Sequence, residues 1–144
     1  MIGPAKIEDA WKVDAKANIT GLKTAATHEA SFDVKTLAAL MPLTPFILFR
    51  WGGISPEPGE RMSDEASGVK KSRFFLSIGA TSLLSKTAAQ RGCYDIIDAV
   101  IDRYDGGTIT TTDGSVDLAL ESVNFVFSDG GLIVYGVEFC YYDN

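Results

Sequence analysis

The most restrictive feature of the sequence lies near its C-terminus, where two apolar runs flank a short polar segment in FVFSDGGLIVYGVEFCYY, residues 125–142. Glycine adopts positive φ without a Cβ clash, and a short Gly-containing loop between two β-rich runs is the sequence form of a hairpin. The stretch therefore predicts a β-hairpin that turns at Ser128-Asp129-Gly130-Gly131.

The second strand of this hairpin is apolar on nearly both sides, although a single-layer sheet should be polar on one. Alternate residues of a strand point to opposite faces of the sheet. The pattern therefore demands a cover for the second face. One face holds Ile133, Tyr135, Val137, Phe139 and Tyr141; the other holds Leu132, Val134, Gly136, Glu138, Cys140 and Tyr142.

Two main helices are predicted. Residues 7–17 place Ile7, Ala10 and Trp11 at helical spacing, and Pro4 shortly precedes them. A longer helix runs to about Tyr104, with Ser85 as its N-cap and Gly106-Gly107 as its stop. Its apolar stripe consists of Cys93, Ile96, Ile97, Val100, Ile101 and Tyr104.

Strands are predicted at residues 46–51, 70–81 and 118–127, with a further small hairpin around Asp113-Gly114. Residues 20–30 fit a weak edge strand or a continuation of the first helix, and Gly21 favours the strand. Asp33 is a plausible N-cap for a short helix that Pro42 and Pro45 end. The order of elements predicts one α+β domain over residues 1–144, with a mostly antiparallel sheet of four to five strands and two main helices on one face.

A long mobile loop is expected at residues 52–69, where four Gly, two Pro and scattered charges leave little apolar area to bury. Compact domains rarely keep such a loop without a use, which suggests that it is functional or becomes ordered on assembly.

Charge is distributed unevenly along the chain. Residues 93–144 hold ten acidic residues and a single basic one, Arg103, and carry a net charge of −9. Residues 1–92 carry +3, which gives the total of −6. Such segregation is consistent with head-to-tail self-association, or simply with a solvated acidic face. A pI near 4.7 argues against general nucleic-acid affinity. No apolar run is long enough to span a bilayer, and MIGPAKIEDAWK lacks a secretory signal, which predicts synthesis in the cytoplasm.

No catalytic constellation is evident. His28 is the single histidine, no G-x-S-x-G elbow occurs, and the Gly pairs lack the residues of phosphate-binding or dinucleotide-binding loops. Cys93 and Cys140 form no CxxC or Cys/His cluster and are interpreted as buried small hydrophobes. The sequence predicts no enzyme, and no catalytic, cofactor or metal site.

Two charged groups are candidate contact surfaces. The densest basic cluster brackets the predicted loop and would meet acidic surface on a neighbour; it consists of Arg50, Arg61, Lys70, Lys71 and Arg73. The second is an acidic stripe on one helix face, formed by Asp95, Asp98 and Asp102 and extended by Asp105. The stripe would face the next subunit or line a lumen through which DNA passes; a solvated face is the simpler alternative.

Four segments in this order resemble the small Mu-like prophage tail protein family, which contains the tail terminator of contractile-tailed phages. They are PFILFRWGG, KKSRFFLSIGATSL, RGCYDIIDAVIDRYDG and FVFSDGGLIVYGVEFCYY, and the similarity covers roughly residues 5–142. Each motif is weak alone, and their order and spacing carry the resemblance. The 52–69 segment is longer than the family pattern suggests.

The resemblance implies a virion protein, made in a host bacterium, that forms a hexameric ring on the head-proximal end of the tail tube. Such a ring would stop tube and sheath polymerisation, dock the neck or head protein, and cover the second face of the C-terminal strand through its neighbours. No cofactor is implied. The alternatives are a head-tail connector or neck protein, a metal-dependent enzyme using the acidic helix, or a monomeric domain that covers its own sheet.

Overall fold

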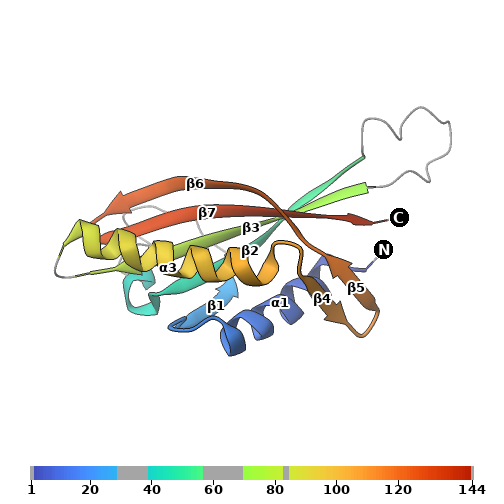
Figure 1. Ribbon diagram of the computed structural model, residues 1–144, viewed down its shortest axis with the longest axis horizontal. Coiled ribbons are helices and arrows are strands. Elements are labelled where there is room, and N and C mark those ends of the chain that lie inside the picture. The colour runs from blue at the N-terminus through green and yellow to red at the C-terminus, as the bar shows by residue number, and fades with distance from the viewer. Residues whose placement is uncertain (1, 29–38, 57–69, 83–84, 144) are drawn as a thin grey trace.

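A twisted five-stranded sheet forms the frame of the molecule, with strand order β1-β2-β3-β7-β6. The computed structural model describes residues 2–28, 39–56, 70–82 and 85–143. The strands are β1 (Thr24–Thr27), β2 (Phe46–Pro56), β3 (Lys70–Thr81), β6 (Ala119–Asp129) and β7 (Leu132–Asp143). β1 pairs with β2 in parallel and every other pair is antiparallel. β1 and β6 therefore form opposite edges of the sheet (Figure 1).

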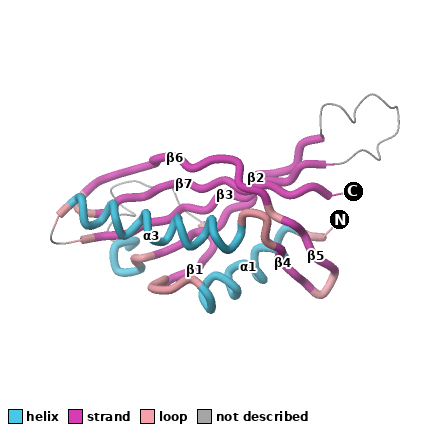
Figure 2. Tube along the Cα trace, in the orientation of Figure 1, coloured by secondary structure: helices cyan, strands magenta, loops and turns pink. Residues whose placement is uncertain are grey.

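Two helices, α1 (Pro4–Asn18) and α3 (Lys86–Tyr104), pack against the same face of this sheet, as Figure 2 shows. A small hairpin of β4 (Thr108–Thr111) and β5 (Gly114–Asp117) lies beside α1. The predicted α+β architecture is confirmed, including the mostly antiparallel sheet and the two main helices on one face.

Local signals account for the ends of these elements. Pro4 occupies the first turn of α1, where a missing N–H costs nothing. Ser85 caps α3 as predicted, because its Oγ accepts a hydrogen bond from the Ala88 N–H at 3.0 Å. The β6–β7 turn places Gly130 at φ +56° and Gly131 at φ +87°, the pair of positive values that a type I′ hairpin requires. The predicted C-terminal hairpin is thereby confirmed.

The core beneath the helices is centred on Trp11, which is fully buried. Its indole ring contacts four aromatic rings at centroid distances between 5.3 and 5.7 Å. We call this group the Trp11 cluster: Trp11, Phe49, Phe74, Tyr104 and Phe139. Because its members come from α1, β2, β3, α3 and β7, the cluster ties both helices to the centre of the sheet.

The opposite face of the sheet has its own small apolar cluster at one end. Phe46 and Leu48 of β2 are buried there with Leu132 and Val134 of β7, and Leu40 and Met41 pack against them. Met41 begins a short 3-10 helix, Met41–Leu43, which precedes β2. The expectation that ring neighbours cover this face is therefore wrong at this end, because the chain supplies the cover itself.

The predicted boundary between the strand at residues 46–51 and the loop at residues 52–69 was wrong. β2 continues to Pro56 instead of ending at Trp51, and Ile54, Ser55 and Pro56 pair with β3. A register shift between Trp51 and Gly53 accommodates Gly52 as a bulge, which lets the strand pass through the Gly-Gly pair. Residues 57–69 lie outside the described residues, as does most of the short helix predicted from Asp33. The ambiguous segment at residues 20–30 contains the edge strand β1.

Candidate interaction surfaces

The predicted basic cluster lies partly on the sheet face opposite the helices, where Arg50, Lys71 and Arg73 share one side of β2 and β3. Lys71 forms an ion pair with Glu121, and Arg73 Nε lies 3.3 Å from a Glu138 carboxylate oxygen. Arg73 also donates a hydrogen bond to Ser55 at 2.8 Å. Two of the predicted contact residues are therefore paired within the chain. We call this group the polar ladder: Ser55, Lys71, Arg73, Glu121 and Glu138.

The electrostatics of the polar ladder follow from this pairing. Hydrogen bonds from the Cys140 thiol and from Lys71 hold the pKa of Glu121 below its usual range, and Glu121 in turn raises the pKa of Lys71. Burial, followed by the nearby Glu121, raises the pKa of the Cys140 thiol to about 11. At neutral pH the ladder is a set of compensated charges beside a protonated thiol, an arrangement that holds β3, β6 and β7 together.

The other predicted basic residues are placed differently. The Arg50 guanidinium lies 5.5 Å from the centre of the Phe75 ring, a cation–π contact that keeps the charge exposed. Lys70 is exposed at the start of β3, and Arg61 lies outside the described residues. Arg50 and Lys70 form no ion pair among the residues that the structure describes. Their role in an interface remains a prediction.

The acidic stripe is exposed on the outer side of α3, with Asp95, Asp98 and Asp102 all facing away from the core. Asp105 differs, because its carboxylate accepts a hydrogen bond from the Leu120 N–H at 3.0 Å and thus fixes the start of β6. Within the described ranges no three His, Cys, Asp or Glu side chains are grouped as a metal site requires. The stripe and the polar ladder lie on opposite sides of the sheet.

Arg103 is the single basic residue of the acidic C-terminal part, and it joins the two helices. Its guanidinium binds the Asp14 carboxylate through two hydrogen bonds of 2.8 Å, and the Tyr104 hydroxyl donates a third at 2.6 Å. These bonds, led by the one from Arg103, lower the pKa of Asp14 despite its partial burial. Burial raises the pKa of Tyr104. The arrangement is a structural lock between α1 and α3.

Sequence reasoning missed an aromatic surface at the β6 edge of the sheet. We call it the aromatic edge: Tyr94 of α3, Val123 and Phe125 of β6, and Tyr135 of β7. Phe125 is 56% exposed and Tyr94 is 44% exposed. The Tyr135 ring lies between them, with centroid distances of 5.7 Å to Tyr94 and 5.6 Å to Phe125. Its only sequence signal was the V-x-F spacing of β6, whose meaning depends on β6 being an edge strand.

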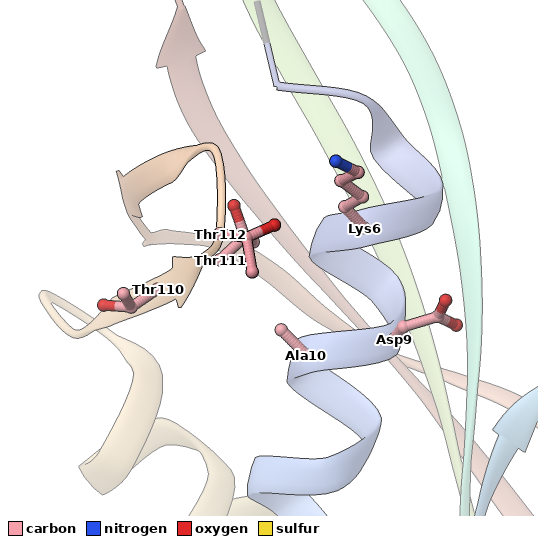
Figure 3. Close-up of a pocket in the computed structure, with 6 residues that line it drawn as sticks. All are labelled: Lys6, Asp9, Ala10, Thr110, Thr111 and Thr112. Atoms are coloured by element: carbon pink, nitrogen blue, oxygen red, sulfur yellow. The ribbon is translucent and has the colours of Figure 1, made fainter.

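Several shallow grooves run along α1, and two of them are considered in turn. One lies between α1 and the β4–β5 hairpin, has a volume of about 480 Å³, and is lined by Lys6, Asp9, Ala10 and Thr110–Thr112 (Figure 3). Ala10 faces the hairpin, whereas the Asp9 carboxylate points away from it. Lys6 is paired with Asp113 at 2.6 Å. No nucleophile and base converge in this groove, so its shape suits a contact surface better than a reaction.

The second groove lies where α1 meets β1, and we call it the α1–β1 hollow. It has a volume of about 560 Å³ and is lined by Asp9, Lys12, Val13, Lys16, Ala17 and Ala25. Val13 is 71% exposed, the largest value for any bulky apolar side chain in the described part of the chain. The hollow is therefore an apolar depression with charged residues at its rim.

The residues considered for catalysis do not come together. His28 follows β1, where its backbone N–H donates to the Phe49 carbonyl at 2.9 Å. Both cysteines are buried, as predicted, and both are free thiols. Burial raises the pKa of Cys93 to about 11, so that the thiol stays protonated at neutral pH. Among the described helices, none is long and apolar enough to cross a membrane.

Comparison with known proteins gives a likeness of fold. No family model matches the sequence, and no curated protein matches it in sequence. A chain of the virion of a native gene transfer agent particle shares the fold with a TM-score of 0.57 at 13% sequence identity. The alignment covers 96% of this chain and 91% of that one. The two chains therefore share an architecture over nearly their whole lengths.

Proposed function

We propose that this protein is a structural component of a phage or phage-like particle, and specifically the tail terminator of a contractile tail. The observation that carries the proposal is the fold shared with a virion chain over 96% of the sequence. The resemblance of the sequence motifs to the tail terminator family supports the finer assignment. The exposed apolar and charged surfaces described above suit a protein that acts by binding.

In this proposal the chain forms a ring, hexameric in the family that it resembles, on the head-proximal end of the completed tail tube. One side of the ring matches the last ring of tube subunits. The other side withholds the surface that a further tube or sheath ring would need, and offers a docking surface to the neck or head protein. DNA passes through the lumen without specific binding, and no cofactor takes part.

Arg50 is the residue of the basic cluster best placed to contact the tube, because its charge is exposed and is held over Phe75. Lys71 and Arg73 contribute less, because Glu121 and Glu138 already compensate their charges. Arg61 and Lys70 lie between Arg50 and Lys71 in the sequence and complete the proposed tube-facing cluster.

The direct test is tube length. Tube subunits encoded with this protein are polymerised in its presence and absence, and the tubes are measured by electron microscopy. The proposal predicts short tubes with a ring at one end when the protein is present, and weaker capping by Arg50→Glu. Arg91→Glu makes the same charge change at an exposed position of α3 and serves as the control.

Unchanged tube lengths, with no ring at the tube end, would refute the assignment as a terminator. If the protein then bound the portal instead of the tube in pull-down experiments, it would be a head-tail connector. Turnover of a metal-dependent substrate would place it outside both classes.

A further inference from the structure

The aromatic edge places exposed apolar side chains, Val123 and Phe125, on a strand at the edge of the sheet. β6 is the last strand of the sheet, so its outer side has no neighbouring strand among the described residues. Proteins normally protect such edges with Lys, Pro or bulges, because an open edge invites another chain. β6 has irregular pairing at Glu121 and Val126, which interrupts regular strand addition. A partner would therefore dock through the side chains of Val123 and Phe125, and a continued sheet is not required.

The α1–β1 hollow is lined by residues of α1 and of β1, and β1 is the other edge strand of the same sheet. Figure 1 shows α1 beside this edge strand, and α1 packs on the same sheet face as α3. Its apolar lining consists of Val13 and Ala17 of α1 with Ala25 of β1. The two alanines leave room for a protruding ring beside the exposed Val13 side chain. The molecule thus has a protruding aromatic surface at one edge and an apolar depression at the other.

Both surfaces carry mixed charges, since Arg91 lies one turn before Tyr94 and Asp9 lines the hollow, but each has one charge of opposite sign that no described ion pair compensates. Asp98 lies one turn after Tyr94 on α3, so it shares the side of the helix that borders the aromatic edge. It is exposed and takes part in no ion pair between described residues. On the other surface, the Lys16 ammonium donates to the carbonyls of Leu22 and Lys23, at 3.1 and 2.5 Å, and forms no ion pair with a described carboxylate. Carbonyls satisfy the donors but leave the positive charge uncompensated.

Lys12 differs from Lys16, since Asp9 lies 3.3 Å from its ammonium. Complementary potentials at an interface fix its orientation and suppress wrong pairings. An aromatic edge facing a hollow places Asp98 near Lys16, whereas two aromatic edges placed together leave Lys16 without a carboxylate.

We infer that the aromatic edge of one copy of this chain docks in the α1–β1 hollow of the next copy, with Phe125 over Val13 and Asp98 towards Lys16. The contact is head-to-tail, because the two surfaces differ. Repetition of a head-to-tail contact closes a ring when the rotation per subunit permits. The inference deepens the proposed function, since it rests on the ring of that proposal and names the surfaces that would build it.

The test uses two variants that each remove one surface. Phe125→Asp disables the aromatic edge but leaves the hollow intact, and Val13→Asp does the reverse. Both positions are exposed, so neither change should unfold the chain; circular dichroism and thermal melting check this directly. Tyr142→Asp, at an equally exposed aromatic residue far along β7, is the matched control.

Native mass measurement and sedimentation give the readout. We expect the wild-type chain and Tyr142→Asp to form the same ring, and Phe125→Asp and Val13→Asp each to be monomeric. An equimolar mixture of the two monomeric variants should form a one-to-one dimer, because one intact edge can still meet one intact hollow. The double variant Lys16→Glu with Asp98→Lys should recover assembly that Lys16→Glu alone weakens.

Rings that survive either single variant would overturn the inference, as would a mixture that stays monomeric. Val13→Asp alone forming a dimer would instead indicate edge-to-edge pairing and would also overturn it. A wild-type chain that stays monomeric at every concentration would have the same consequence. The tube-length experiment tests the proposed function separately. If the protein is a terminator that assembles through other surfaces, it will still shorten tubes, but both variants will keep their rings.

Discussion

The Trp11 cluster and the aromatic edge have the same chemistry but opposite relations to solvent. Both are groups of aromatic rings on the helix side of the sheet, with centroid distances of about 5.3–5.7 Å. The first is enclosed by five elements, and the second is open where the sheet ends. Enclosed rings contribute fully to the free energy of unfolding, whereas the rings of Phe125 and Tyr94, exposed to 56% and 44%, have further surface to bury on assembly. The comparison separates positions that hold the fold from positions that are available for assembly.

The largest expected effect is at the centre of the enclosed cluster. Trp11→Ala removes a fully buried ring that contacts four others, leaving a cavity that both helices border. We expect the free energy of unfolding to fall by about 3–5 kcal/mol. Urea denaturation followed by circular dichroism measures this value. Trp51→Ala is the comparison: Trp51 is 38% exposed and lies outside the cluster, so we expect a smaller loss that includes its hydrogen bond to Ser72.

A smaller effect is expected on the opposite face, at Gly79 of β3. A Cβ atom there would lie 2.2 Å from the Phe46 ring, which packs directly over the glycine. Gly79→Ala must displace this buried ring, and we expect the free energy of unfolding to fall by about 1–3 kcal/mol. Gly3→Ala is the control, because nothing lies within 4 Å of the added carbon. Equal stability of both variants would show that Phe46 can move away without cost.

The lock between α1 and α3 should show a pH signature. Asp14→Asn removes the carboxylate charge that Arg103 and Tyr104 contact. We expect the free energy of unfolding to fall by about 1–2 kcal/mol at pH 7. Because the folded state lowers the pKa of Asp14, its contribution is complete well above the ordinary value of 3.8 and is lost as pH falls below it. The difference in melting temperature between wild type and Asp14→Asn should therefore narrow below about pH 4. A constant difference across this range would assign the effect to packing.

The elements that the sequence predicted well are those with local signals. Ser85 is an N-cap residue and marks the start of a helix. Gly130-Gly131 permits a turn with positive φ angles that few other residues allow. These signals depend on the backbone of a few adjacent residues, so they can be read without the rest of the fold. The same holds for the alternation of β3 and for the apolar stripe of α3.

What the sequence did not predict depends on which strands become neighbours. The continuation of β2 past Gly52 is fixed by its pairing with β3. The partners of Lys71 and Arg73, Glu121 and Glu138, lie more than 40 residues away along the chain and meet them only because β7 and β6 follow β3 in the sheet. The exposure of Phe125 has the same origin, since an alternating strand looks identical at the centre and at the edge of a sheet.

The smallest effect on stability is expected at the aromatic edge, and it is the one that makes the comparison most informative. Phe125→Ala removes a ring that is already 56% exposed, together with its edge-on contact with Tyr135. We expect the free energy of unfolding to fall by about 0.5–1 kcal/mol. If the ring is there for assembly, the same change should shift the oligomer towards monomer far more than a loss of this size in the fold would explain. Sedimentation at several concentrations, beside denaturation of the same samples, separates the two quantities. A large loss of stability with unchanged assembly would instead make Phe125 an outlying member of the core, and the contrast with Trp11 would be one of degree.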